Sequence, residues 1–150
     1  METQRLDVLI EWDDRYSVGV PAIDAQHKQL LELTNKLYKA CLKGEAAAKL
    51  EFEDTLHEAV DYVRFHFSAE EKILEQIHYP GLLEQKKQHA EFVKEVMEGA
   101  KKFQDGKTFV PNNFVRFLKE WILAHIAVSD QRYGEYIENL HKKGMLTGTL

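Results

Sequence analysis

Histidines at four separate places are the residues of this chain best suited to chemistry. His27, His66, His89 and His125 each fall in a different segment with helical periodicity. Glu70 follows His66 by four residues in "HFSAE", which is about 40° round a helix, so an imidazole and a carboxylate share one face. This combination of side chains predicts a metal site.

A single inward histidine is more often a core residue with one hydrogen-bond partner. Inward histidines on all four helices would each need a buried partner, which a metal with shared carboxylates supplies and an apolar core does not. Imidazole with carboxylate suits zinc, iron, copper or nickel, and a long four-helix bundle can hold two ions. We expect the other histidines to lie elsewhere: His57 facing solvent, His78 in a turn and His141 in the tail.

Asp130 is a further candidate whose spacing alone does not make it a ligand. It follows His125 by five residues, which in a regular α-helix is about 140° away. A local π-bulge would rotate its carboxylate inward, and such bulges occur at functional sites.

The elements that must position these residues are predicted from apolar spacing and from scarce breakers, with 3 prolines and 8 glycines. We expect an all-α, antiparallel up-down-up-down four-helix bundle with an N-terminal arm and a short C-terminal helix. The third helix would begin near Pro80, and the fourth would be capped by Asn112 or Asn113. Beyond it, the segment around Gly134 either continues that helix or forms a short fifth. The expected division is one domain with an arm (1–20), a bundle (about 21–131) and a tail (132–150).

Composition limits the partners. With 150 residues and 44% apolar residues the chain can bury a core, and its net charge of -5 carries no basic field for nucleic acid. No apolar stretch is long enough for a membrane span, and the N-terminus lacks the features of an export signal. The single cysteine excludes an internal disulfide and fits a reducing compartment. We expect a cytoplasmic monomer with no nucleic-acid or membrane partner; no protein partner is identifiable.

Four segments of the sequence resemble the hemerythrin family, in its prokaryotic single-domain form: "W...YSVGVPAIDAQHKQLLELTNKL", "YVRFHFSAEEKIL...YPG", "HAEF" and "FLKEWILAHIAVSDQRY". The resemblance spans nearly the whole chain. It implies a bundle with two non-haem irons (Fe2+/Fe3+), bridged by two carboxylates and an oxo or hydroxo group, with O2 as ligand. The resemblance assigns the ligands as follows: His27 and His66 on the iron that takes up O2, His89 and His125 on the other, and Glu70 and Asp130 as bridges.

Gln85 departs from the family pattern. The family carries a third histidine one turn before the position of His89, and here that position is Gln85. The glutamine still points at the site, and its amide oxygen is a weaker and harder ligand than imidazole. Three outcomes are open: ligation through oxygen, a water in the vacant position, or one poorly held ion. We expect weaker metal binding or an altered redox potential there.

The function that this resemblance implies is reversible O2 binding for storage, transport or sensing, without catalytic residues. The alternative is a di-iron enzyme or redox sensor acting on peroxide or nitric oxide through an opened coordination site. A purely structural bundle is the third reading. Apolar residues near the bundle centre are more often core, but Ile122, Trp121 and Tyr62 are candidates for an oxygen pocket, with Ile122 as its gate.

Overall fold

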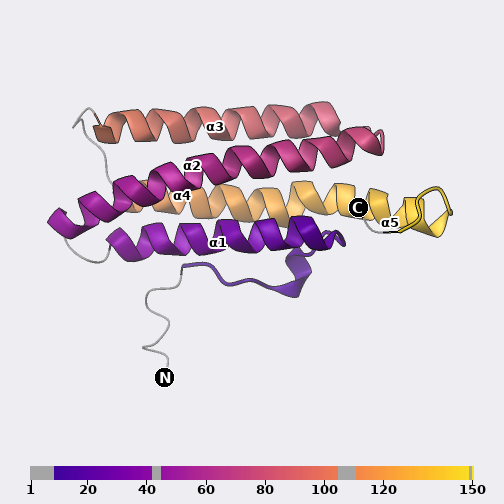
Figure 1. Ribbon diagram of the computed structural model, residues 1–150, viewed down its shortest axis with the longest axis horizontal. Helices are drawn as coiled ribbons and strands as arrows, with labels where there is room; N and C mark the ends of the chain where they lie inside the picture. Colours follow the sequence, from indigo (N-terminus) through magenta and orange to yellow (C-terminus); the bar gives the residue numbers. More distant parts are fainter. Residues whose placement is uncertain (1–8, 42–44, 105–110, 149) are drawn as a thin grey trace, which may run out of the picture.

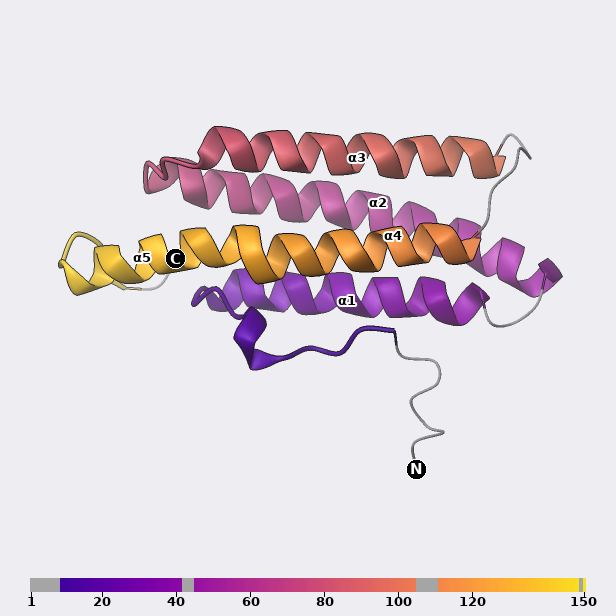
Figure 2. The same ribbon diagram turned by 180° about the vertical axis from the view of Figure 1, so that it is seen from behind.

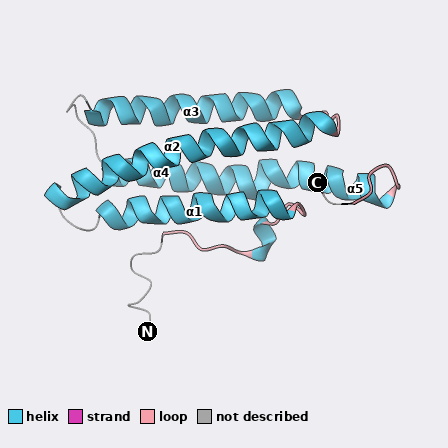
Figure 3. Ribbon diagram, in the orientation of Figure 1, coloured by secondary structure: helices cyan, strands magenta, loops and turns pink. Residues whose placement is uncertain are grey.

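The predicted all-α bundle is confirmed by a computed structural model that describes residues 9–41, 45–104, 111–148 and 150. Within these residues every regular element is helical, and the helices of the bundle alternate in direction along one axis (Figures 1 and 3). The bundle consists of α1 (Pro21–Cys41), α2 (Glu45–Gln76), α3 (Leu82–Gln104) and α4 (Pro111–Ala124). A shorter helix, α5 (Asp130–Lys142), continues the line of α4, and a 3-10 turn covers Asp14–Tyr16.

Two helix starts differ from the sequence prediction. α3 begins at Leu82 rather than near Pro80, because Pro80 belongs to the turn that joins α2 to α3. α4 begins at Pro111, so Asn112 and Asn113 lie inside its first turn and do not cap it. Proline is well suited to a first helical position, because the N–H that it lacks would have no partner there.

A π-helical turn, His125–Ser129, joins α4 to α5 and is called the π turn below. The three elements follow one line in Figures 1 and 2, so the chain turns no corner after α4, and α5 projects beyond the ends of α1 and α3. Gly134 lies inside α5 without breaking it. A Cβ atom at Gly134 would lie 3.0 Å from the carbonyl oxygen of Val18, so glycine allows α5 to pack closely on the N-terminal arm. The C-terminal segment therefore forms the expected short helix.

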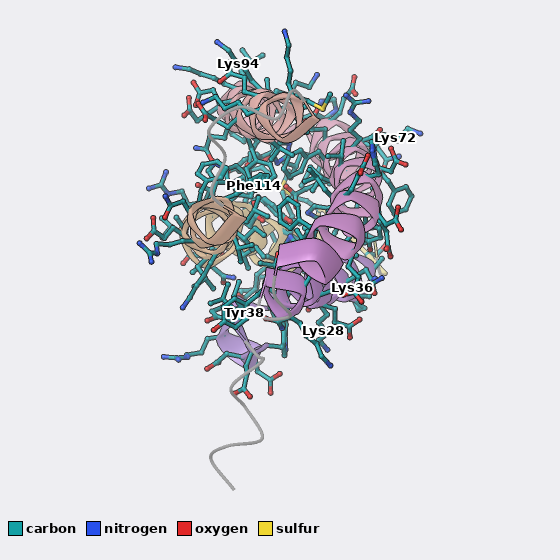
Figure 4. The ribbon with its side chains drawn as sticks, turned by 90° about the vertical axis from the view of Figure 1, so that its left-hand side faces the viewer. Lys28, Lys36, Tyr38, Lys72, Lys94 and Phe114 are labelled. Atoms are coloured by element: carbon teal, nitrogen blue, oxygen red, sulfur yellow. The ribbon has the colours of Figure 1, made fainter. Side chains whose placement is uncertain are left out.

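Two apolar clusters fill the interior. The main cluster lies among α1, α2, α3 and α4, and the end cluster joins Val18 and Ile23 to Leu74, Tyr133 and Ile137. Figure 4 looks along the bundle: Phe114, of the main cluster, lies inside the ring of helices, whereas the labelled lysines point outward. Burial of these apolar surfaces is the main force that holds the helices together.

The N-terminal arm is fastened to α1 by polar side chains. The Asn35 amide accepts from the backbone N–H groups of Leu9 and Ile10 at 2.9 and 2.8 Å, and donates to the carbonyl of Ile10 at 2.7 Å. Asp24 accepts from the Ser17 hydroxyl and from the Val18 N–H. The division of the chain into arm, bundle and tail stays a prediction. Within the described residues, no helix combines the length and the apolar character needed to cross a bilayer.

Candidate metal centre

Four buried imidazoles converge on one carboxylate between the two apolar clusters. Nε2 of His27 and Nε2 of His66 each lie 3.3 Å from Oε2 of Glu70. On the opposite side of the same carboxylate, Nε2 of His89 lies 3.0 Å and Nε2 of His125 lies 3.7 Å from Oε1. All five side chains are buried, and each histidine comes from a different helical segment.

The π turn brings Asp130 to the same place. The backbone N–H of Asp130 donates to the carbonyl of His125, five residues back, instead of to the residue four back. Its carboxylate, fully buried, lies with Oδ1 at 3.0 Å from Nε2 of His125 and Oδ2 at 3.2 Å from Nε2 of His27. Asp130 therefore has one oxygen toward each pair of histidines, as Glu70 does.

The site divides into two halves that share both carboxylates. We call His27 with His66 the first half, and His89 with His125 and Gln85 the second half. Two ligand triads are close enough to hold a cation each, and Glu70 belongs to both: His27, His66, Glu70 and Glu70, His89, His125.

The outer nitrogens of three imidazoles are held by side-chain oxygens. Nδ1 of His66 donates to Oε1 of Gln26 at 2.7 Å. Nδ1 of His89 donates to Glu71 at 2.7 Å, and Nδ1 of His125 donates to Gln88 at 3.1 Å. Because these oxygens only accept, each of the three Nδ1 atoms carries a proton, and Nε2 is the nitrogen that faces the site and that would bind a metal, which is the arrangement of metal-binding histidines.

These outer contacts follow a pattern along the chain. Gln26 precedes His27 on α1 yet holds a histidine of α2. Glu71 follows Glu70 on α2 yet holds a histidine of α3, and Gln88, beside His89 on α3, holds a histidine of the π turn. Each residue that flanks the site on one helix thus orients the imidazole of the next helix. Nδ1 of His27 has no such partner among the described residues.

Gln85 reaches the second half from α3. It is 3% exposed, and its Nε2 donates to Oδ1 of Asp130 at 3.0 Å. Its amide oxygen, Oε1, is buried without a hydrogen-bond partner in the described residues. The structure therefore brings Gln85 to the site together with His27, His66, Glu70, His89, His125 and Asp130.

Tyr133 is a further contact of Glu70. Its hydroxyl donates to Oε2 at 2.9 Å, and the residue is 1% exposed. Burial, with the nearby charges of Glu70 and Asp130, raises the pKa of Tyr133 well above its usual value, so the phenol keeps the proton that it donates. Tyr133 therefore limits which way the Glu70 carboxylate can rotate.

Charge and burial oppose one another in the site. Burial lowers the pKa of His27, but hydrogen bonds to Asp130 and Glu70 outweigh it and raise this pKa to about 9. At His125 burial also lowers the pKa, and the charge of Asp130 raises it to about 9. Burial lowers the pKa of His66, which Glu70 offsets only in part. Burial would raise the pKa of both carboxyls, but the surrounding histidines hold Glu70 well below and Asp130 below the usual range. The carboxylates therefore stay ionised beside the imidazoles.

Two of the three residues predicted to line an oxygen pocket border a cavity, and the third does not. Ile122 and Trp121 border a small cavity of about 10 Å³ that also touches His66 and His125, which is about the least space that holds one water molecule. Trp121 stacks on the ring of His125 at 4.5 Å between centroids. Tyr62 is half-buried, packs beside Phe65 and is not among the cavity's lining residues.

Sequence reasoning missed Gln26, Glu71, Gln88 and Tyr133. The first three sit next to predicted site residues, which was an available signal, but adjacency does not say which neighbouring helix a side chain faces. His57, His78 and His141 are exposed, as expected of histidines outside the site.

The donor set fits a pair of cations. Four imidazole nitrogens and two shared carboxylates, both ionised, are ligands that first-row divalent metals accept. Oε1 of Gln85, which is buried without a partner in the described residues, is an acceptor that a cation could satisfy. The geometry and the chemistry of the site are therefore both suited to holding metal ions.

Comparisons with known proteins agree with this assignment. Residues 18–137 match the family model described as the hemerythrin HHE cation binding domain. The chain is 33% identical to a bacteriohemerythrin of Stenotrophomonas maltophilia (87% of this chain, 82% of the relative) and 32% identical to one of Clostridium acetobutylicum (81% and 96%). A crystal structure of wild-type hemerythrin superposes with a TM-score of 0.79 at 29% identity, covering 85% of this chain and 96% of that one. The resemblance in the sequence is confirmed, and the chain belongs to the hemerythrin family.

Proposed function

We propose that this protein binds O2 reversibly at two iron ions held by His27, His66, Glu70, His89, His125 and Asp130. The observation that carries the proposal is the arrangement of the two carboxylates, each with one oxygen toward each pair of imidazoles. Three of the four imidazoles are also held with Nε2 free to bind a cation. Iron is the metal that the resemblance to the hemerythrin family implies, and the match to the family model supports that family.

The iron pair, when bound, would supply the two electrons that O2 binding requires. The protein's own residues would then do three things. Glu70 and Asp130 would neutralise positive charge and fix the spacing of the two positions. Tyr133 would hold the orientation of Glu70 through its 2.9 Å hydrogen bond. The outer acceptors would keep the histidines in the tautomer that binds metal.

The small cavity supports O2 as the ligand. Apart from two histidines its walls are apolar: Leu30, Val63, Phe67, Phe92, Trp121, Ile122 and Ile126. Such a lining favours a small uncharged molecule over water and anions, which would need hydrogen bonds that these walls do not offer. Ile122, which is 4% exposed and borders the cavity one turn before His125, is the proposed gate.

The test is the visible absorption spectrum of reduced, iron-loaded protein while O2 is added and then removed. A charge-transfer band that appears with O2 and disappears on its removal is the expected result. Direct passage to a stable oxidised spectrum would contradict reversible binding and would favour the enzyme or sensor reading. Loading with two iron ions per chain should be measured on the same sample, so that the metal site and the O2 chemistry are tested separately.

A further inference from the structure

The Gln85 side chain has one polar end in use and one free. An amide group presents two N–H donors at one end and an acceptor oxygen at the other. The nitrogen end is in use, because Nε2 of Gln85 donates to Oδ1 of Asp130 at 3.0 Å. The oxygen end, Oε1, lies buried with no partner among the described residues.

A buried amide oxygen without a hydrogen-bond partner costs free energy. Gln85 is 3% exposed and lies one turn before His89, so both side chains enter the site from the same face of α3. Its other neighbour, Asp130 Oδ1, lies 3.0 Å from Nε2 of His125. The amide group of Gln85 therefore lies beside the second half, with its nitrogen 3.0 Å from the Asp130 oxygen that faces His125.

We propose that Oε1 of Gln85 is a metal ligand of the second half, which makes the two metal positions unequal in their preference among metals. The inference rests on the two-metal site of the proposed function and specifies its second position. The Gln85 N–H group meanwhile holds Asp130 by its hydrogen bond, so a single side chain both binds the ion and orients a bridging carboxylate.

The two halves then differ in donor chemistry. The first half offers two imidazole nitrogens and one oxygen from each shared carboxylate. The second half offers two imidazole nitrogens, the other oxygen of each carboxylate, and the amide oxygen. Oxygen donors suit harder ions such as Mn2+, whereas an additional imidazole would suit Zn2+, Fe2+ or Cu2+. The second position should thus discriminate less against Mn2+ than a site with a histidine in place of the glutamine.

The test titrates Mn2+ and, separately, Zn2+ into the full-length chain freed of metal, with bound ions counted by mass spectrometry of the metal. Wild-type protein should bind two ions. Gln85→Leu should keep the first binding step and weaken the second for Mn2+ at least about 10-fold. Gln85→Glu should keep both steps, because it retains an oxygen donor. Gln85→His should shift the second position toward Zn2+ over Mn2+ by at least about 10-fold.

Two controls assign the steps. His66→Ala disables the first half, so the same Gln85 series in that background measures the second half alone. Gln85→Met keeps the length of the side chain and supplies a sulfur that does not suit Mn2+, which covers the case in which the leucine variant fails to fold.

The outcomes separate the two proposals. Equal Mn2+ affinity of the second step in wild type, Gln85→Leu and Gln85→Met would overturn the role of Gln85 while leaving the two-metal site intact. A single ion bound by the wild type would overturn the two-metal site itself, and the role of Gln85 with it.

Discussion

The two halves of the metal site share their carboxylates but differ in how their histidines are held. In the second half, both imidazoles are fixed from behind, His89 by Glu71 and His125 by Gln88. In the first half, as far as the described residues go, His66 alone has such a support. The ring of His27 instead packs edge-on against that of His66, with 4.7 Å between centroids and an interplanar angle of 72°.

This difference separates a preorganised half from an adjustable one. A ligand that is held by a second hydrogen bond keeps its orientation with or without metal, whereas His27 depends on its contacts inside the site. The second half is therefore suited to a fixed ion. The first half keeps one ligand that can adjust when a further molecule binds, which agrees with the O2 uptake that the family resemblance implies for this half.

Removing the shared carboxylate should have the largest effect. Glu70→Ala is expected to abolish tight binding of both ions, because one oxygen of Glu70 serves each half. His66→Ala should lose only the ion of the first half. The measurement is the number of Co2+ ions retained per chain after dialysis, with circular dichroism to check that helix content is kept. Retention of two ions by Glu70→Ala would mean that the halves do not depend on a common ligand.

The metal-free protein should lose stability as pH rises from 6.5 to 9. His27 and His125, one in each half, have pKa values raised from 6.5 to about 9, so their contribution is complete below pH 6.5 and is lost as pH passes 9. His66, with a lowered pKa, is neutral in both folded and unfolded chains across most of this window and changes little.

Urea unfolding at several pH values measures this effect. Between pH 6.5 and 9 the unfolding free energy should fall by about 1.4 kcal/mol per pH unit for each of the two histidines, as an order of magnitude. Metal-loaded protein should show the opposite trend at low pH, because protons compete with the ions for the same nitrogens. A metal-free stability that rises between pH 6.5 and 9 would contradict the protonation of His27 and His125.

Tyr133→Phe tests whether the Glu70 carboxylate, which both halves share, needs the hydrogen bond from the Tyr133 hydroxyl. We expect a loss of about 2 kcal/mol in the unfolding free energy of metal-free protein, because a buried, ionised Glu70 would lose a hydrogen bond. Tyr136→Phe is the matched control, since the Tyr136 hydroxyl contacts two backbone carbonyls at the long distance of 3.5 Å. Equal losses in the two variants would show that the phenol of Tyr133 has no special role.

Removing the acceptors behind His66 and His125 should have the smallest effect on metal binding. Gln88→Leu is expected to weaken the ion of the second half about 10-fold, and Gln26→Leu the ion of the first half by a similar factor. Each variant serves as the control for the other in the same metal titration. If either variant weakened both steps equally, the support would act on the whole site and the distinction between the halves would fail.

The fold was largely predictable because apolar spacing and scarce breakers specify long helices. The same spacing brought His66 and Glu70 to one face, since four residues make nearly one helical turn. Helix starts were less predictable: Asn112 and Asn113 are good caps in isolation, yet the proline before them already begins α4. Local propensity could not decide between these adjacent starts.

The site was predictable to the extent that it depends on regular helices. The position of Asp130 could not be predicted in this way, because it depends on the π turn, which apolar periodicity alone does not reveal. A different reason explains why the sequence did not reveal Gln26, Glu71 and Gln88. Each accepts a hydrogen bond from a histidine on a neighbouring helix, and the residue spacing within one helix does not determine how that helix is rotated in the bundle. The position of Tyr133 depends on the π turn, which precedes it, and also on the rotation of its helix, because its hydroxyl contacts Glu70 on α2.

The π turn also sets the rotational register of the rest of the chain. Deleting one residue between Ile126 and Ser129 would restore regular helical bonding and rotate all that follows by about 100°. Asp130 would swing away from His27, and Tyr133 and Ile137 would leave the end cluster for solvent. Metal site and C-terminal packing would fail together, so in this short stretch the number of residues is constrained more tightly than their identity.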